Sequence, residues 1–270
     1  MLVRHAAVIA TAVVALAGCA AAQPAEPTPV LLDSTDLRLP LDDYLLSQKD
    51  LDTLGRARVV WLRECMGEAG FDFPPAPEQV DTGLRSWNER RYGITDEELA
   101  AVDGYGLGAR DPAARPPLPR PTPEQRAALE GPDGCLEHTE AQQRRDSPPD
   151  VDRGLPQRLS TESFTRSRGA PRVRAVLESW SECMRAKDYA YADPLAAASD
   201  ERFTGRVTPV ELAVAAADIE CKRKTNLVGV WFSAEQEIQR DLVAANRAAL
   251  ADVRQANTAE IDRARHVVGT

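Results

Sequence analysis

The chain has 270 residues, enough to bury a sizeable core in one domain or two. Its 33 basic and 42 acidic residues give a net charge of −9, which makes nucleic acid and anionic lipid headgroups poor partners for the body as a whole. Aromatic residues make up 5% and charged residues 28%, a composition that favours water-exposed helices over a β-sandwich.

The N-terminus has the pattern of an export signal. Arg4 precedes an apolar run over residues 6–17, which is too short to span a bilayer as a helix. The run ends in the sequence LAGC, which closes at Cys19 and resembles a bacterial lipobox. The resemblance implies a signal peptide over residues 1–18 and lipidation of Cys19. An ordinary signal peptide with an incidental cysteine is the alternative.

The segment that follows is predicted to be a lipidated tether over residues 19–40, because its prolines at 24, 27 and 29 do not suit regular structure. Two or three acyl chains would hold the chain to a bilayer, whereas a single chain gives marginal anchoring. We therefore expect an extracytoplasmic protein whose first partner is the cell membrane, through its N-terminal lipid.

A first helical pattern runs from about residue 42 to residue 69, with a break expected before Leu51. Gly70 and the two prolines at 74 and 75 indicate where it ends. Spacings of three and four place one set of residues on the face expected to be buried: Val59, Leu62, Cys65, Met66 and Ala69.

A motif of this helix recurs 118 positions later. WLRECMGEAGFDF (61–73) and SWSECMRAKDYAY (179–191) both place aromatic residues six and eight positions after the cysteine of a Cys-Met pair. The second copy is expected to end a helix over residues 171–187, and Asp188 takes the place of Gly70, which Asp tolerates better than most residues do. Residues expected to face inward are Val173, Val176, Leu177, Trp180, Cys183 and Met184.

Further helix starts carry capping signatures. They are Thr95 with Glu98, Thr122 with Pro123 and Gln125, and Thr208 with Pro209 and Glu211. The proline-rich sequence over 111–123 is predicted to be a stiff surface excursion, and the basic run over 222–224 a solvated helix end. From residue 226 the pattern is helical to the end of the chain, with the part beyond Asn257 expected to project or fray.

The cysteines favour a disulfide framework. Assigning Cys19 to lipid leaves Cys65, Cys135, Cys183 and Cys221, an even set that suits an oxidising compartment but allows three pairings. Each Cys-Met motif is followed by one later cysteine with a threonine four places on, which favours Cys65–Cys135 and Cys183–Cys221. In the chain-entropy model each bond stabilises the fold by roughly 4 kcal/mol.

Metal and cofactor chemistry has little support in the sequence. C-x-x-C and C-x-x-C-H motifs and paired Cys/His zinc spacings do not occur, and Cys135 with His138 is a lone pair of potential ligands. We expect neither a metal nor a cofactor. The predicted fold is all-α and disulfide-stapled, with a partial internal duplication. It consists of a first helical half over 41–149 with the proline-rich insert, and a second over 150–270 with a long C-terminal helix.

These motifs together resemble a group of uncharacterised exported lipoproteins of high-GC Gram-positive bacteria, such as streptomycetes. The resemblance is carried by the lipobox, the paired Cys-Met motifs, ERRYGITD, DGYG and DIECKRKT, and it covers less than half of the chain. The usual motif is C-M-x3-G-aromatic-x-aromatic, from which the second copy departs at Asp188. The resemblance implies no particular activity.

The favoured function is a non-enzymatic envelope module that binds or supports another envelope component, with an envelope protein as a second possible partner. A cell-wall or small-ester hydrolase is the alternative, and it would depend on His138 or on Glu64 paired with Glu182. A solute-binding lipoprotein of a transporter is a further alternative, which usually requires alternating strands and helices around a cleft.

Overall fold

A computed structural model describes residues 28–74, 83–112, 119–131, 133–145, 147–148 and 150–269. Within these ranges the regular structure is helical and no strand forms, which confirms the all-α prediction. The elements are η1 (Pro40–Tyr44), α1 (Gln48–Glu68), α2 (Glu97–Asp103), η2 (Gly108–Arg110), α3 (Pro123–Glu130), α4 (Cys135–Arg144), α5 (Leu155–Arg168), α6 (Pro171–Arg185), α7 (Pro194–Ala198), η4 (Glu201–Phe203), α8 (Pro209–Thr225), α9 (Leu227–Ala245) and α10 (Arg247–Val268).

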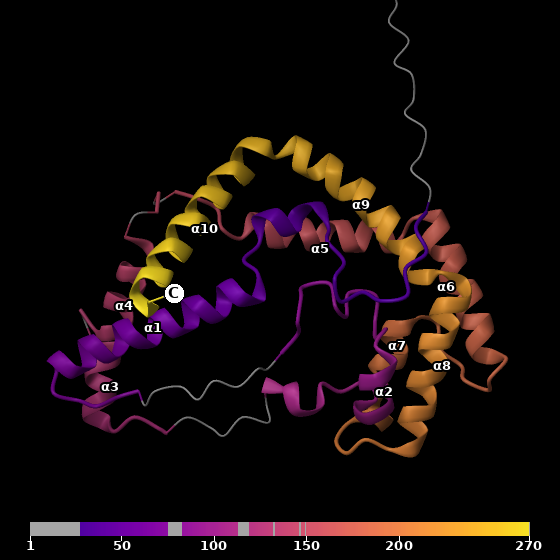
Figure 1. Cartoon of the computed structure of the whole chain (residues 1–270), viewed down its shortest axis with the longest axis horizontal. Helices are drawn as coiled ribbons and strands as arrows, with labels where there is room; N and C mark the ends of the chain where they lie inside the picture. Colours follow the sequence, from indigo (N-terminus) through magenta and orange to yellow (C-terminus); the bar gives the residue numbers. More distant parts are fainter. Residues whose placement is uncertain are drawn as a thin grey trace, which may run out of the picture.

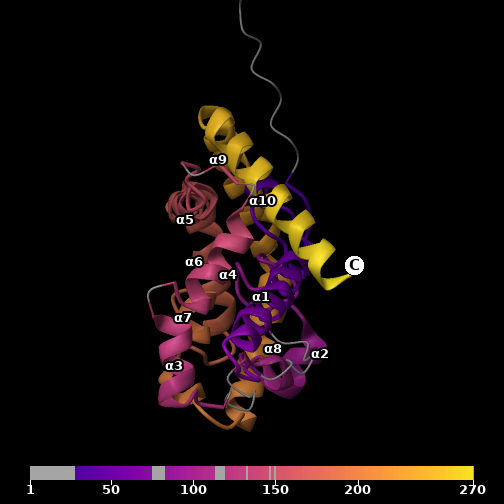
Figure 2. The ribbon, with the colours of Figure 1, turned by 90° about the vertical axis from the view of Figure 1, so that its left-hand side faces the viewer.

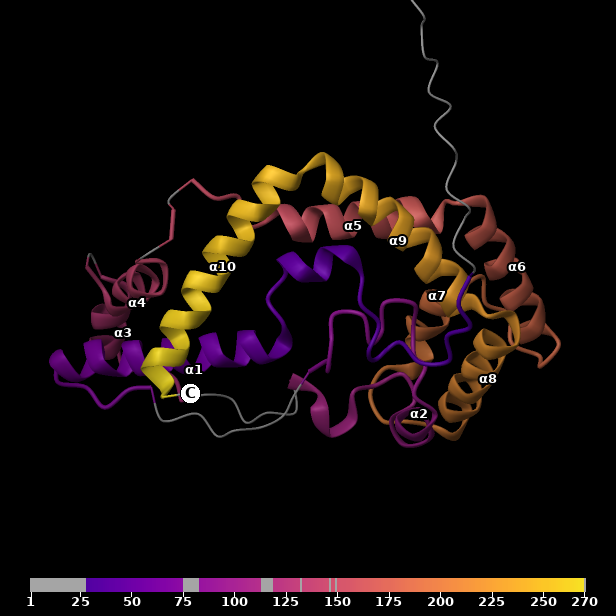
Figure 3. The same cartoon turned by 45° about the horizontal axis from the view of Figure 1, so that its top comes forward.

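The molecule is an arch with a helical cluster at each end. Figure 1 and Figure 3 show α9 and α10 forming the arch, with α2, α6 and α8 at one end and α1, α3 and α4 at the other. Helix α5 packs along α9, and α10 packs on α1. Figure 2, viewed from the end that carries α1, shows α10 running down beside that helix.

The predicted long C-terminal helix is present as α10, and α9 precedes it as a separate helix. Asn246 (φ −115°) separates α9 from α10, and its side-chain amide donates to the Leu242 carbonyl at 2.8 Å. The expectation that the chain projects or frays beyond Asn257 was wrong. Ile261 and Ala264 are buried against α1.

The end of α10 is buried because α1 has more apolar surface than expected. The predicted buried face of α1 was only partly correct. Met66 is buried, but Ala69 is exposed, and a second stripe is buried as well: Leu54, Ala57 and Trp61. That stripe needs an apolar cover, which the last turns of α10 provide.

Both Cys-Met motifs end their helices in the same way. The Phe71 amide donates to the Met66 carbonyl at 2.8 Å, and the Tyr189 amide donates to the Met184 carbonyl at 3.0 Å. These six-to-one bonds are those of a Schellman ending, which requires a left-handed residue. Gly70 (φ +85°) provides it in the first copy, and Asp188 (φ +65°) does so in the second. The predicted duplication is therefore present in the backbone.

The main core joins the middle of the sequence to its second half. Tyr92 and Tyr105 are buried in the same cluster as Trp180 and Trp231, and α2 packs on α8. Together with the packing of α10 on α1, these contacts cross the division expected at residue 149.

The expected tether is shorter than 19–40. From residue 29 onward the chain is docked on the body: Ser34 is fully buried, Leu39 is 3% exposed, and Leu41 is part of a buried cluster. The Ser34 amide donates to Thr95 Oγ1 at 3.1 Å, the two hydroxyl oxygens lie 2.9 Å apart in a hydrogen bond, and the Ser34 hydroxyl donates to the Glu89 carbonyl. Docking is favourable because Leu31 and Leu37 pack against the main hydrophobic core.

Two of the three capping predictions are confirmed. Thr122 forms a capping box with Gln125, and Thr208 caps α8 through its bond from the Glu211 amide. Helix α2 starts later than expected, because Asp96 is its cap, while Thr95 bonds Ser34. The proline-rich excursion lies partly outside the described residues, which omit 113–118.

Candidate functional site

The four predicted cysteines form the predicted disulfides. Cys65–Cys135 joins α1 to α4, and Cys183–Cys221 joins α6 to α8, with Cα separations of 5.6 and 5.7 Å. Those separations lie in the unstrained range for a disulfide. The bonds therefore crosslink opposite ends of the arch, one in each helical cluster. Cys19, the predicted lipidation site, lies outside the described residues.

The segment Glu89–Asp96 is held in place by hydrogen bonds and ion pairs of its charged side chains. Glu89 pairs with Arg85 and with Arg110, whose Nη2 is 3.0 Å from the Glu89 carboxylate. Burial alone would raise the pKa of Glu89, but hydrogen bonds from Arg110 and Arg85 hold it below its usual value of 4.5. Arg90 donates to the carbonyls of Tyr105 and Gly106, so the segment also fixes the loop after α2.

Glu235 is the buried acceptor at the centre of the arch. Its carboxylate is fully buried and receives two hydrogen bonds from Arg91, one from the Tyr92 hydroxyl at 2.9 Å and one from Ser163 at 2.7 Å. Gln239 extends the network by accepting from the Leu41 amide at 3.0 Å. Because a buried carboxylate is costly unless its lone pairs are satisfied, this network fixes α5, α9 and the central segment in one arrangement.

A second buried pair lies on α8 and corrects the interpretation of the basic run 222–224. Lys222 is 1% exposed, and its Nζ lies 2.8 Å from both Asp218 Oδ2 and the Ile94 carbonyl. Burial raises the pKa of Asp218 and lowers that of Lys222, against their mutual attraction. Gly93 (φ +89°) leaves the space that Lys222 occupies. Only Lys224 has the solvated position expected for the run.

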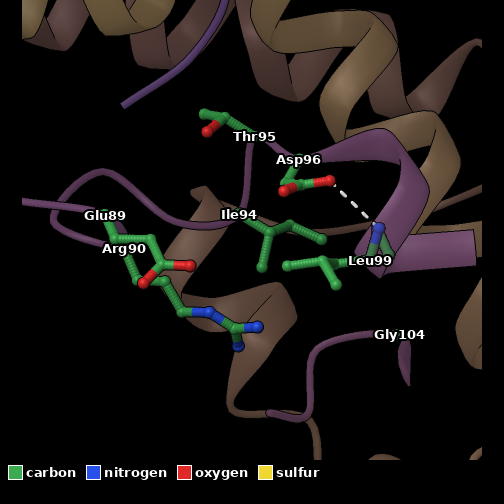
Figure 4. A pocket seen from close by; sticks show the side chains of 8 residues that line it. Glu89, Arg90, Ile94, Thr95, Asp96, Leu99 and Gly104 are labelled. Carbon is green, nitrogen blue, oxygen red and sulfur yellow. Dashed lines mark hydrogen bonds between the residues drawn. The ribbon is translucent and has the colours of Figure 1, made fainter. Parts of the chain in front are cut away.

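A small cavity beside this segment is too small to be a substrate site. Figure 4 shows Ile94 and Leu99 near each other at its wall, with Asp96 capping the Leu99 amide and the Arg90 side chain extending toward Gly104. Its volume of about 10 Å³ is no larger than one water molecule needs. Lys222 does not line it, so this lysine is buried away from any ligand there.

A wider groove lies where the docked N-terminal segment meets residues 85–88. It has a volume of about 380 Å³, within the range of roughly 300–1,000 Å³ typical of ligand sites. Trp87 is 37% exposed on its wall, and the indole Nε1 donates to the Leu46 carbonyl at 2.7 Å. Because that polar atom is engaged, the exposed part of the indole is ring carbon.

Polar groups surround the Trp87 ring in fixed positions. Asn88, 2% exposed, donates to the Leu37 carbonyl at 2.8 Å and to Asp42 at 2.6 Å. Burial raises the pKa of Asp42. Two acidic and two basic side chains line the groove, and these are Asp36, Asp42, Arg38 and Arg85. Their charges balance, so the groove suits a polar ligand of low net charge better than a strong anion or cation.

The residues required by a hydrolytic mechanism are not brought together. Glu64 and Glu182 are exposed beside different disulfides, on α1 and α6 at opposite ends of the arch. His138 is exposed on α4 and contacts Gln142 at 3.3 Å. In the described part of the chain, no cluster of His, Cys, Asp and Glu is suited to hold a metal ion.

Comparison with known proteins found no match for this chain among protein-family models, curated proteins or solved structures. Of the helices described, none has both the length and the apolar composition that crossing a bilayer requires. The Trp87 groove is the candidate binding site because an exposed indole and charged and polar side chains line it. Sequence reasoning missed it because Trp87 has no periodic or motif context that marks it.

Proposed function

We propose that the protein is an extracytoplasmic lipoprotein, anchored to the cell membrane through Cys19, that binds an envelope component without chemistry of its own. The proposal depends on the roles of the five cysteines. Four of the five are paired in disulfides of relaxed geometry, and Cys19 follows an export-type apolar run in a lipobox-like sequence. Stable disulfides belong to oxidising compartments, which supports export.

The Trp87 groove supports the binding part of the proposal. Its walls are held by the Asn88 hydrogen bonds and by the Arg85–Glu89 pair, so a ligand meets a largely preformed surface. A half-exposed indole among amide, hydroxyl and balanced charged groups suits a polar, low-charge molecule that also has an apolar face. Wall glycan has both properties, since its sugar rings expose C–H faces as well as hydroxyls.

Anchoring is tested with Cys19→Ala. Cells that express the unsubstituted chain should retain it in the membrane fraction, and mass spectrometry should find acyl groups on its N-terminal peptide. The Cys19→Ala chain should leave the membrane fraction. Retention of this variant, or an unmodified cysteine in the unsubstituted chain, would refute the lipid anchor.

Binding is tested through the fluorescence of Trp87. The other three tryptophans, Trp61, Trp180 and Trp231, are at most 5% exposed, so acrylamide quenching reports on Trp87. Solubilised wall glycan fragments should protect this emission in a saturable way. Trp87→Ala removes this reporter, so the variants are compared by calorimetry. Trp87→Ala should bind no glycan, whereas Val102→Ala, which removes exposed apolar surface from α2, should bind as the unsubstituted chain does. Equal binding by the two variants, or no saturable protection, would refute the groove as the site.

A further inference from the structure

The first residues that the structure describes are hydrogen-bonded to the corner between α8 and α9. Asn226, in left-handed conformation (φ +52°), accepts a hydrogen bond from the Leu31 amide at 3.2 Å and donates one to the Pro29 carbonyl at 2.9 Å. Gly229, in the first turn of α9, lies against the same carbonyl, and any Cβ there would collide with it. The N-terminal segment is therefore held at one defined place on the body.

Two large apolar side chains on this segment face outward. Leu31 packs against the main core, while its neighbours Val30 and Leu32 are 73% and 52% exposed. Inward and outward residues alternate here as they do in any extended backbone. Exposed single apolar residues are common, but this pair is held beside the point where the chain leads toward Cys19.

The distance from this contact to Cys19 is bounded by the chain itself. Thr28 is 28 − 19 = 9 residues from Cys19, and nine residues reach at most about 30 Å when fully extended. A lipid on Cys19 would thus keep the α8–α9 corner close to the bilayer. The cluster that carries Cys65–Cys135 lies at the other end of the arch, as Figures 1 and 3 show.

We propose that the α8–α9 corner, with Val30 and Leu32, is the membrane-facing surface, and that the Cys65–Cys135 end points away from the bilayer. This inference rests on the proposed lipidation of Cys19. The occupant of the apolar pair is a lipid surface, because the pair adjoins the end of the chain that the Cys19 lipid would hold at the bilayer. The contact is apolar, so it does not require anionic headgroups.

The test uses the full lipidated chain in phosphatidylcholine vesicles. A polarity-sensitive dye is attached to Leu32→Cys or, as a matched control, to Val102→Cys, which is 70% exposed on α2. The dye at position 32 should shift its emission to the blue and lose intensity when the lipid acyl chains carry bromine. The dye at position 102 should do neither.

A second variant tests the contact that fixes the orientation. Gly229→Ala should displace Pro29 and abolish the blue shift at position 32, while the protein still floats with vesicles. Gly55→Ala is the control, because nothing lies within 4 Å of a Cβ at this helical position, and it should leave the shift unchanged. Circular dichroism confirms that both variants fold.

The outcomes separate the two proposals. A chain that does not float with vesicles refutes the lipid anchor and the orientation together. A chain that floats with a water-exposed dye at position 32 refutes the orientation alone. Equal shifts at positions 32 and 102, or a shift that persists in Gly229→Ala, would also refute the held orientation.

Discussion

Replacement of Lys222 by methionine should be among the most destabilising single changes in the protein. Lys222→Met keeps the apolar stem but removes the ammonium group that donates to Asp218 and to the Ile94 carbonyl, both at 2.8 Å. Asp218 would keep two donors, Trp180 Nε1 at 3.0 Å and the Tyr105 hydroxyl at 3.3 Å. Neither neutralises its charge, and the carboxylate is fully buried.

The magnitude follows from that burial. Breaking a buried ion pair by removing one partner costs roughly 3–5 kcal/mol, because the remaining charge is left without compensation. Asp218→Asn in the Lys222→Met background removes that charge and leaves an amide oxygen that can accept from Trp180. The double variant should therefore recover most of the lost stability, because replacing a buried ion pair by uncharged groups often changes the free energy of unfolding little.

The assay is urea unfolding of the oxidised protein at pH 7, followed by helical circular dichroism. Lys224→Met, on the exposed side of the same helix, is the control and should change the free energy of unfolding by about 0.5 kcal/mol or less. A loss below about 1 kcal/mol in Lys222→Met would refute the claim that Lys222 compensates the buried charge of Asp218. A double variant that is no more stable than the single one would refute it as well.

Three further predictions concern the motifs and the central segment. Asp188→Gly should stabilise the fold by up to about 1 kcal/mol, and Gly70→Asp should destabilise it, because only glycine adopts the left-handed conformation without strain; thermal unfolding measures both. Replacing Cys183 and Cys221 by serine should cost roughly 4 kcal/mol in chemical unfolding, and no loss would contradict the crosslink model. Because the pKa of Glu89 is lower in the folded than in the unfolded chain, its stabilising contribution is complete above pH 4.5 and is lost as the pH falls through the folded value; Glu89→Gln should flatten this acid dependence.

Local patterns predicted the parts of the fold that depend on neighbouring residues. The Cys-Met motifs gave both helix ends, since a left-handed residue and a following aromatic are specified within six positions. The Thr122 and Thr208 caps were predicted for the same reason. The disulfide pairing was also predicted, because the duplication assigned one later cysteine to each motif.

Predictions failed where a distant segment decides the environment of a residue. Asp218 stands one helical turn before Lys222, but nothing nearby in the sequence shows that Ile94, 128 positions away, will accept from Lys222 in a buried site. The end of α10 looks polar enough to project, yet Trp61 and its neighbours on α1 give it a surface to bury against.

The sequence by itself determined an all-helical fold class, the ends of the helices that carry the Cys-Met motifs and the two crosslinks, because these follow from hydrogen bonds and steric preferences within a few residues and from an internal repeat. Only the tertiary structure decided that the helices form an arch, that the N-terminal segment docks at Asn226, and that Trp87 borders a groove. Those features depend on which apolar surfaces meet across long separations, and residue periodicity carries no information on that choice.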